Sequence, residues 1–134
     1  MTIKTLVVGD LKTNCYLVTD EETREALIID PGDEADFITT TILENKLIPQ
    51  AILLTHGHYD HCLGVLELKL NFNLPIYLHQ ADLFLYQQVY KSASHWSPIS
   101  LVKGRSPASG GERDLKPPKI DIYLKDNQII PFGN

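Results

Sequence analysis

The chain is 134 residues long, 43% hydrophobic and 22% charged, which is the composition of one globular domain large enough to bury its own core. Its formal net charge of −5 gives no electrostatic reason to bind nucleic acid or an anionic membrane. The chain has two cysteines without CxxC spacing, which does not suggest a disulfide framework. We find no signal-peptide core and no apolar run of about 18 residues, so neither export nor membrane spanning is supported. We therefore expect a cytoplasmic protein.

Three short runs of mainly aliphatic and β-branched residues open the chain and predict three strands. They are "IKTLVVG", "NCYLVT" and "EALIID", at residues 3–9, 14–19 and 25–30. The polar stretch between the last two predicts a hairpin. "DPGD" then breaks the extended pattern, and apolar residues at helical spacing predict a helix that Asp33 caps, that runs to about Leu47 and that Pro49 ends.

The middle of the chain predicts two further strands and two helices. "AILLT", at 51–55, is a continuous apolar run, as in strands that helices cover on both faces of a sheet. We then expect a helix at about 63–70, a strand at 75–79 and a helix at about 81–90. The predicted order to this point is βββαβαβα.

Residues 91–119 differ in kind from the rest of the chain. They contain thirteen Ser, Gly or Pro, and six Lys or Arg against two Asp or Glu, so that they carry +4 and the other residues carry −9. This composition predicts a long flexible basic loop, either a lid that steers an anionic substrate or a solvated linker without a ligand. After it, "KIDIYL" and "NQIIPF" predict a terminal hairpin around residues 125–127.

The segment "THGHYDHCLG", residues 55–64, holds three of the five histidines. His56 and His58 are two positions apart, so in an extended loop both side chains can reach one ion. Asp60 and His61 follow after the chain has turned and can serve a second, neighbouring ion. Such ligands suit zinc, iron or manganese, and ions about 3.5–4 Å apart can generate hydroxide at neutral pH. Surface histidines without a ligand role are the weaker alternative at the end of a buried strand.

At this point the sequence resembles a known family. "THGHYDH" is similar to the T-H-x-H-x-D-H signature of the metallo-β-lactamase superfamily, and "TNCYLV" (13–18) and "LIIDPGD" (27–33) resemble the opening strands of its hydroxyacylglutathione hydrolase (glyoxalase II) branch. The resemblance implies an α+β fold, the αββα sandwich of that family, represented here mainly by its N-terminal sheet and helices. It covers nearly the whole chain.

The resemblance also implies a function, a metal-dependent hydrolase that cleaves a small anionic thioester or related ester through metal-bound hydroxide. His56 and His58 would bind the first ion, and Asp60 and His61 the second, with zinc the expected metal and iron or manganese as alternatives. Asp60 would also orient or deprotonate the attacking water. A lactonase or an iron-dependent persulfide dioxygenase of the same fold would carry the same loop. A nuclease is less favoured, because the body is acidic and Trp96 is the one aromatic residue in the basic loop.

The remaining ligands of that family come later in its sequence, after a hairpin like the one at the end of this chain. We therefore expect residues 1–134 to be a single, C-terminally truncated domain that binds metal weakly, since catalytic zinc sites use three protein ligands and a water. The contrasting hypothesis is a noncatalytic domain that binds a partner. In either case an uncovered apolar sheet face would favour self-association.

Four other residues have two interpretations each. Asp30 is either a partner of a metal ligand or an ordinary turn residue of "DPG". His79 can approach the site, although a structural or supporting role is favoured, and His95 is either a mobile ligand or simply exposed. Cys62 is more easily explained as a small buried side chain than as a ligand or redox thiol.

Overall fold

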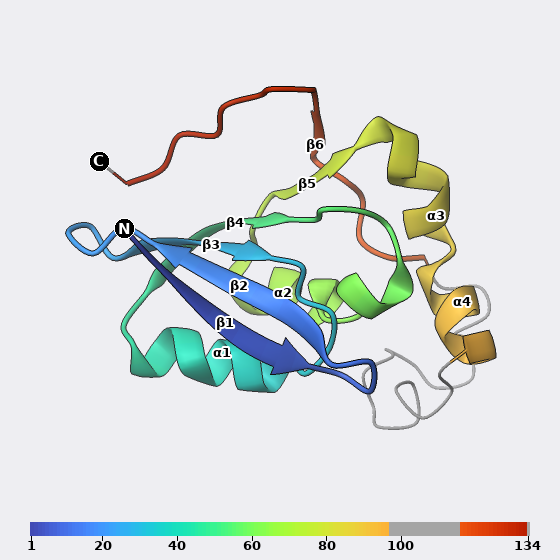
Figure 1. Cartoon of the computed structure of the whole chain (residues 1–134), viewed down its shortest axis with the longest axis horizontal. Helices are drawn as coiled ribbons and strands as arrows, with labels where there is room; N and C mark the ends of the chain where they lie inside the picture. The colour runs from blue at the N-terminus through green and yellow to red at the C-terminus, as the bar shows by residue number, and fades with distance from the viewer. Residues whose placement is uncertain (97–115, 134) are drawn as a thin grey trace.

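The computed structural model describes residues 1–96 and 116–133. Within these residues the chain forms one mixed sheet in the order β1-β2-β3-β4-β5-β6 (Figure 1). The strands are β1 (Thr2–Val8), β2 (Thr13–Thr19), β3 (Glu25–Ile29), β4 (Ile48–Leu53), β5 (Ile76–His79) and β6 (Ile122–Leu124). The first three strands pair antiparallel, and β3 to β6 pair parallel. The expected α+β class and the predicted hairpin of β2 and β3 are confirmed.

Two helices, α1 (Ala35–Glu44) and α2 (Val65–Phe72), pack on one face of this sheet. Side chains alternate between the faces of a strand, so Cys15 and Leu17 of β2 lie fully buried on the helix side. The core joins strand and helix residues, among them Leu17, Ile28, Ile52, Ile76, Ile38, Ile42, Val65 and Leu68. Burying one such aliphatic side chain contributes about 1.5–3 kcal/mol, which fixes the helices and the loops that lead into them.

α1 is shorter at both ends than the sequence predicts. Glu34, and not Asp33, directly precedes the helix, while Asp33 Oδ1 accepts a hydrogen bond from the adjacent Glu34 N–H (2.7 Å). At the other end α1 stops at Glu44, and Lys46 adopts the left-handed conformation with φ 54°. Pro49 lies inside β4, close to a shift in the register with β3. Such an irregularity accommodates a residue without an N–H, so Pro49 belongs to the strand.

The predicted helix at 81–90 is divided into two. A short 3-10 turn, η2 (Gln80–Asp82), is followed by α3 (Leu83–Gln87) and α4 (Val89–Trp96). The division lies at Gln88, whose N–H bonds to the Leu85 carbonyl in a tightened last turn of α3. Within the described residues, no helix has the length and apolar character needed to cross a membrane.

The prediction of a flexible loop at 91–119 is wrong for its first residues, because α4 continues to Trp96. Tyr90 and Ala93 of α4 are 4% and 0% exposed, and this burial anchors the helix on the core. Residues 116–119 belong to neither a helix nor a strand. The rest of the predicted basic loop, 97–115, lies outside the described residues.

The predicted terminal hairpin is also wrong. β6 pairs parallel with β5, with Tyr123 opposite Leu78, and residues 128–133 do not form a strand. They run instead along the side of the sheet turned away from α1 (Figure 1). Ile130 and Phe132 line a cavity of about 350 Å³ there, together with Leu27 of β3 and Ala51 of β4. Pro131 has no N–H to contribute to a ladder, and the apolar sheet face offers the segment a surface on which to pack.

Candidate metal centre

Two loops build the candidate site, each leaving the C-terminal end of a parallel strand. Residues 30–33 follow β3, and residues 54–64 follow β4 and include the 3-10 turn η1 (Tyr59–His61). The Leu63 N–H donates to the Gly32 carbonyl (3.1 Å) and the Gly64 N–H donates to the Pro31 carbonyl (2.8 Å). The two loops are therefore joined through their backbones at the edge where α/β proteins commonly place a site.

Glycines allow this close approach. A Cβ at Gly32 would lie 2.0 Å from the Asp60 carbonyl oxygen, and a Cβ at Gly57 would lie 2.7 Å from the Tyr86 nitrogen of α3. Neither position has room for a side chain. The histidine loop is thus held between the loop after β3 and α3 with the residue that precedes it, Asp82.

The fold brings the four predicted ligands together. The ring centroids of His56 and His58 are 4.7 Å apart, and those of His56 and His61 are 4.1 Å apart. His61 Nε2 lies 3.4 Å from Asp60 Oδ2. Contacts therefore occur within each predicted pair, His56 with His58 and Asp60 with His61, and also between the pairs. Whether each pair holds its own ion stays a prediction.

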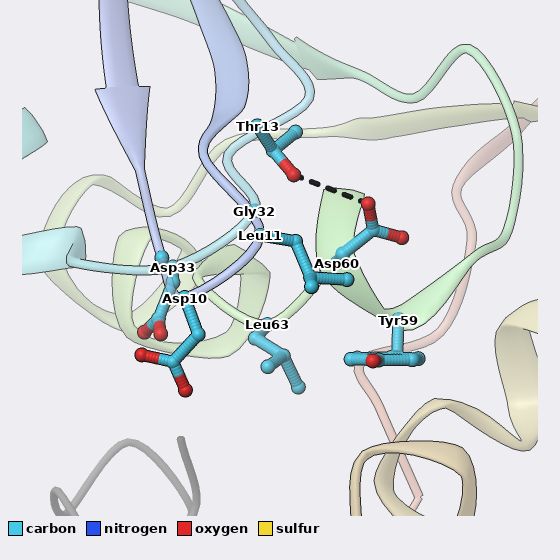
Figure 2. Close-up of a pocket in the computed structure, with 9 residues that line it drawn as sticks. Asp10, Leu11, Thr13, Gly32, Asp33, Tyr59, Asp60 and Leu63 are labelled. Atoms are coloured by element: carbon cyan, nitrogen blue, oxygen red, sulfur yellow. Dashed lines mark hydrogen bonds between the residues drawn. The ribbon is translucent and has the colours of Figure 1, made fainter. Parts of the chain in front are cut away.

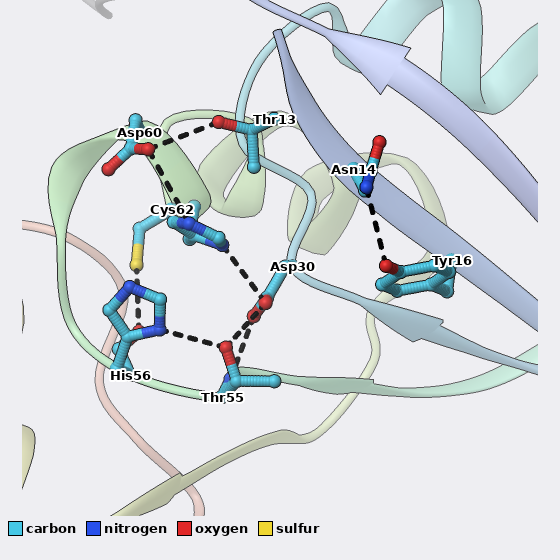
Figure 3. Close-up of polar contacts among 9 residues, drawn as sticks. Thr13, Asn14, Tyr16, Asp30, Thr55, His56, Asp60 and Cys62 are labelled. Carbon is cyan, nitrogen blue, oxygen red and sulfur yellow. Dashed lines mark hydrogen bonds and ion pairs between the residues drawn. The ribbon is translucent and has the colours of Figure 1, made fainter. Parts of the chain in front are cut away.

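Asp30 is the buried polar centre of this cluster and is 3% exposed. One of its oxygens accepts from the Thr55 N–H (2.7 Å); the other accepts from the Thr55 hydroxyl and lies 3.0 Å from His61 Nδ1 (Figure 3). The Thr55 hydroxyl also contacts His56 Nδ1 at 2.9 Å. Of the two interpretations of Asp30, its contacts favour the partner of a metal ligand.

The donor set fits a metal ion. A carboxylate at His61 Nδ1 favours the tautomer that carries its proton there and leaves Nε2 as the ligand atom, the usual arrangement at metal-binding histidines. Asp30, His56 and His61 each offer one ligand atom, and these atoms lie within 4.8 Å of one another. Desolvation, followed by the neighbouring His61 and His58, lowers the pKa of His56, although the nearby carboxylates oppose this effect. The neutral imidazole that a lowered pKa favours is the form that binds metal.

Thr13 contributes a contact that the sequence interpretation missed. Its hydroxyl, at the start of β2, donates to Asp60 Oδ2 at 3.1 Å. The β1–β2 turn then places Leu11 beside Tyr59 and Asp60, around a cavity of about 10 Å³ (Figure 2), roughly the space of one water. Thr13 and Thr55 both belong to the motifs on which the family resemblance rests, and this membership is the one sign in the sequence that they matter. It does not indicate which residue each threonine contacts.

The other candidate residues lie outside the cluster. His79 ends β5, where its Nδ1 accepts a hydrogen bond from the Ala81 N–H (3.1 Å), a contact that favours the structural role. His95 is exposed on α4. Cys62 is 3% exposed and belongs to the core, and burial raises the pKa of its thiol well above 9.0, as expected for a small buried side chain.

Comparison with known proteins matches residues 8–125 to the metallo-beta-lactamase superfamily. The Probable metallo-hydrolase YqgX of Bacillus subtilis is 39% identical over an aligned length of 149 residues, and the alignment takes in 95% of this chain and 67% of that protein. The Hydroxyacylglutathione hydrolase GloC of Haemophilus influenzae is 36% identical over 97 residues, which cover 72% of this chain and 45% of that protein.

Among solved structures, the di-iron-bound form of TTHA1623 superposes with a TM-score of 0.76 at 34% identity, covering 95% of this chain and 56% of that one. The chain spans about half the length of most of the curated relatives it matches. The expected family and its sandwich fold, of which the described residues form the N-terminal part, are confirmed.

Proposed function

Because this chain belongs to the metallo-β-lactamase superfamily, we propose that it is a metal-dependent hydrolase whose ions bind to His56, His58, Asp60 and His61. The observation that carries the proposal is the cluster itself. Three imidazoles are in ring contact beside a carboxylate, and the buried Asp30 lies 3.0 Å from Nδ1 of His61. Surface histidines without a ligand would not need such a buried carboxylate behind them.

His56 and His58 are proposed to hold one ion, and Asp60 and His61 a second. Zinc suits this mixture of imidazole and carboxylate, and iron or manganese would also fit. When bound, the ions would supply Lewis-acid activation of water and of the substrate carbonyl. Since a catalytic zinc ion takes three protein ligands, these four residues leave each ion in need of a further one.

The chain's own residues would orient the reactants and move protons. Asp60 Oδ2 faces His61 Nε2, which leaves Oδ1 to orient the attacking water and accept its proton. Asp30 would keep His61 in the ligating tautomer. Asp60 is therefore the proposed catalytic residue as well as a ligand.

The proposed substrate is a small anionic thioester or a related ester. The support is the similarity to GloC, which is named a hydroxyacylglutathione hydrolase. We also propose that the protein acts in the cytoplasm, because both cysteines are free thiols buried in the fold. We propose no nucleic-acid or membrane partner, because a net charge of −5 gives no electrostatic attraction to either.

Metal titration of the purified chain tests the proposal. The protein is stripped with a chelator and titrated with zinc, alongside His58→Ala and, as a matched control, His95→Ala on α4. We expect at least one equivalent to bind, His58→Ala to weaken binding by about tenfold or more, and His95→Ala to leave it unchanged. Binding below one equivalent that His58→Ala does not alter would refute the metal site.

Activity assays on the zinc-loaded and iron-loaded chain then separate the reactions. Thioester hydrolysis that depends on His58 would support the proposal. Lactone hydrolysis or persulfide oxidation without thioester hydrolysis would assign another reaction of the same fold. Metal binding without any turnover would support the noncatalytic alternative.

A further inference from the structure

Asp60 is held from outside its own turn. It lies in η1, a single 3-10 turn in which no side chain caps the first N–H groups. Among residues 1–96 and 116–133, its carboxylate has two polar side-chain contacts, Thr13 Oγ1 at 3.1 Å and His61 Nε2 at 3.4 Å. Both reach the same oxygen, Oδ2 (Figure 3). His61 is itself a proposed metal ligand, whereas Thr13 is not. Thr13 therefore can hold Asp60 in place whether or not a metal ion is bound.

Thr13 is well suited to fix a side chain. It is 6% exposed and begins β2, where it pairs with Val8 of β1 in a regular ladder. A β-branched residue in a strand has few rotamers, so its hydroxyl points in a defined direction. That hydroxyl has one proton, and it donates this proton to an oxygen 47 positions further along the chain.

We propose that Thr13 is a positioning residue for Asp60, an inference that rests on the proposed function. Its hydrogen bond sets the rotation of the carboxylate, so that Oδ2 is presented beside His61 Nε2 and Oδ1 is turned to the other side. Because the hydroxyl donates to Oδ2, the direction in which that carboxylate oxygen points is fixed by the strand. Loss of the donor would leave a partly buried carboxylate oxygen short of a partner.

A merely structural bond between β2 and η1 would behave differently. It would change the stability of the metal-free chain and leave the metal environment as it was. Thr13→Val tests this distinction, since valine keeps the shape and the strand preference and lacks the donor. Thr13→Ser restores the donor and is the matched control.

The test uses cobalt, whose visible absorption reports the coordination of the ion. Wild type, Thr13→Val, Thr13→Ser and Asp60→Asn are stripped of metal and titrated with Co²⁺ against a chromogenic chelator, and denaturant unfolding of each metal-free chain is recorded. Asp60→Asn defines the affinity and the spectrum that depend on Asp60. We expect Thr13→Val to lose affinity by about tenfold, as for other supporting partners of ligands, and to shift the spectrum toward that of Asp60→Asn. Thr13→Ser should retain both.

Wild-type affinity and spectrum in Thr13→Val, with Asp60→Asn impaired, would overturn the inference and leave the proposed function intact. If Asp60→Asn also binds like wild type, the metal site itself falls and the inference with it. A loss of metal-free stability in Thr13→Val that Thr13→Ser does not share, with unchanged cobalt affinity and spectra, would assign Thr13 the merely structural role and overturn the inference.

Discussion

The two oxygens of Asp30 serve three donors, which are the Thr55 N–H, the Thr55 hydroxyl and, in the ligating tautomer, His61 Nδ1. Asp30→Asn would replace one acceptor oxygen with a donor, so at least one of these groups would lose its partner inside the fold. We expect a loss of about 1–3 kcal/mol in the free energy of unfolding and about tenfold weaker zinc binding. Denaturant unfolding and zinc competition measure the two effects. A stable variant with unchanged zinc affinity would show that Asp30 is only a turn residue.

Cys15 is buried near Asp30, and its thiol should make the stability of the fold depend on pH in the alkaline range. Burial, followed by the charge of Asp30, raises the pKa of its thiol from 9.0 to about 12. Above pH 9.0 the unfolded chain loses the thiol proton while the folded chain keeps it, so folding binds the proton more tightly. The stability contribution is fully present below that pH and is lost as the pH rises toward 12, by up to about 1.4 kcal/mol per pH unit.

We therefore expect the free energy of unfolding to fall less steeply with pH in Cys15→Ala than in wild type over this alkaline range. Urea unfolding at a series of pH values measures the slopes. Other buried groups, including Tyr90, titrate in both proteins, so the difference between the slopes isolates Cys15. Parallel slopes would contradict the prediction.

At the scale of elements, the site depends on two loops that fit against each other at Gly32. An alanine Cβ there would overlap the Asp60 carbonyl oxygen, and one of the loops would have to move. We expect Gly32→Ala to cost about 1–3 kcal/mol of stability and to weaken zinc binding at the same time. Unfolding and zinc titration of the variant measure both quantities.

Gly133→Ala is the matched control. Gly133 is also crowded, against the Asp20 side chain, but Asp20 follows β2 at the end opposite Thr13. This variant should lose some stability and keep its zinc affinity. Equal effects of both variants on zinc binding would mean that general destabilisation, and not the fit of the two loops, controls the site.

The same elements show what the sequence can and cannot predict. Strands with alternating or continuous apolar residues, such as β2 and β4, were predicted within a few residues, because burial alone determines them. The ligand-bearing loop was predicted from the spacing of His56, His58 and Asp60. The missed features depend on partners distant in sequence: Tyr90 and Ala93 extend α4 by packing on the core, the segment after β6 lies on a sheet face, and Thr13 meets Asp60 across the sheet edge. Local patterns carry no information on such contacts.

For the molecule as far as the structure describes it, helices cover one face of the sheet, and the described residues cover the other face only in part. Residues 130–133 lie over the middle of the outward face, next to Leu27 and Ala51, which are 6% and 3% exposed. Toward the edge, Ile3 and Val7 of β1 are 67% and 53% exposed. They point to the outward side together with Tyr16 and Val18, as the register of β1 and β2 requires. That residues 1–134 fold as one domain stays a prediction. The outward face of the sheet predicts self-association, which can be tested in solution.

We expect the outward face to pair with that of a second copy, so that the chain self-associates as its concentration rises. Replacing both Ile3 and Val7 with threonine keeps the strand preference and removes exposed apolar surface. Since burying one such side chain contributes about 1.5–3 kcal/mol and about 1.4 kcal/mol is a tenfold change in affinity, the double variant should associate at least about tenfold more weakly. Sedimentation velocity over a range of concentrations measures this. Leu70→Gln is the control, because Leu70 is 73% exposed but belongs to α2, on the helix side of the sheet. A wild-type chain that stays monomeric, or a control that dissociates equally, would exclude the sheet face as the site of association.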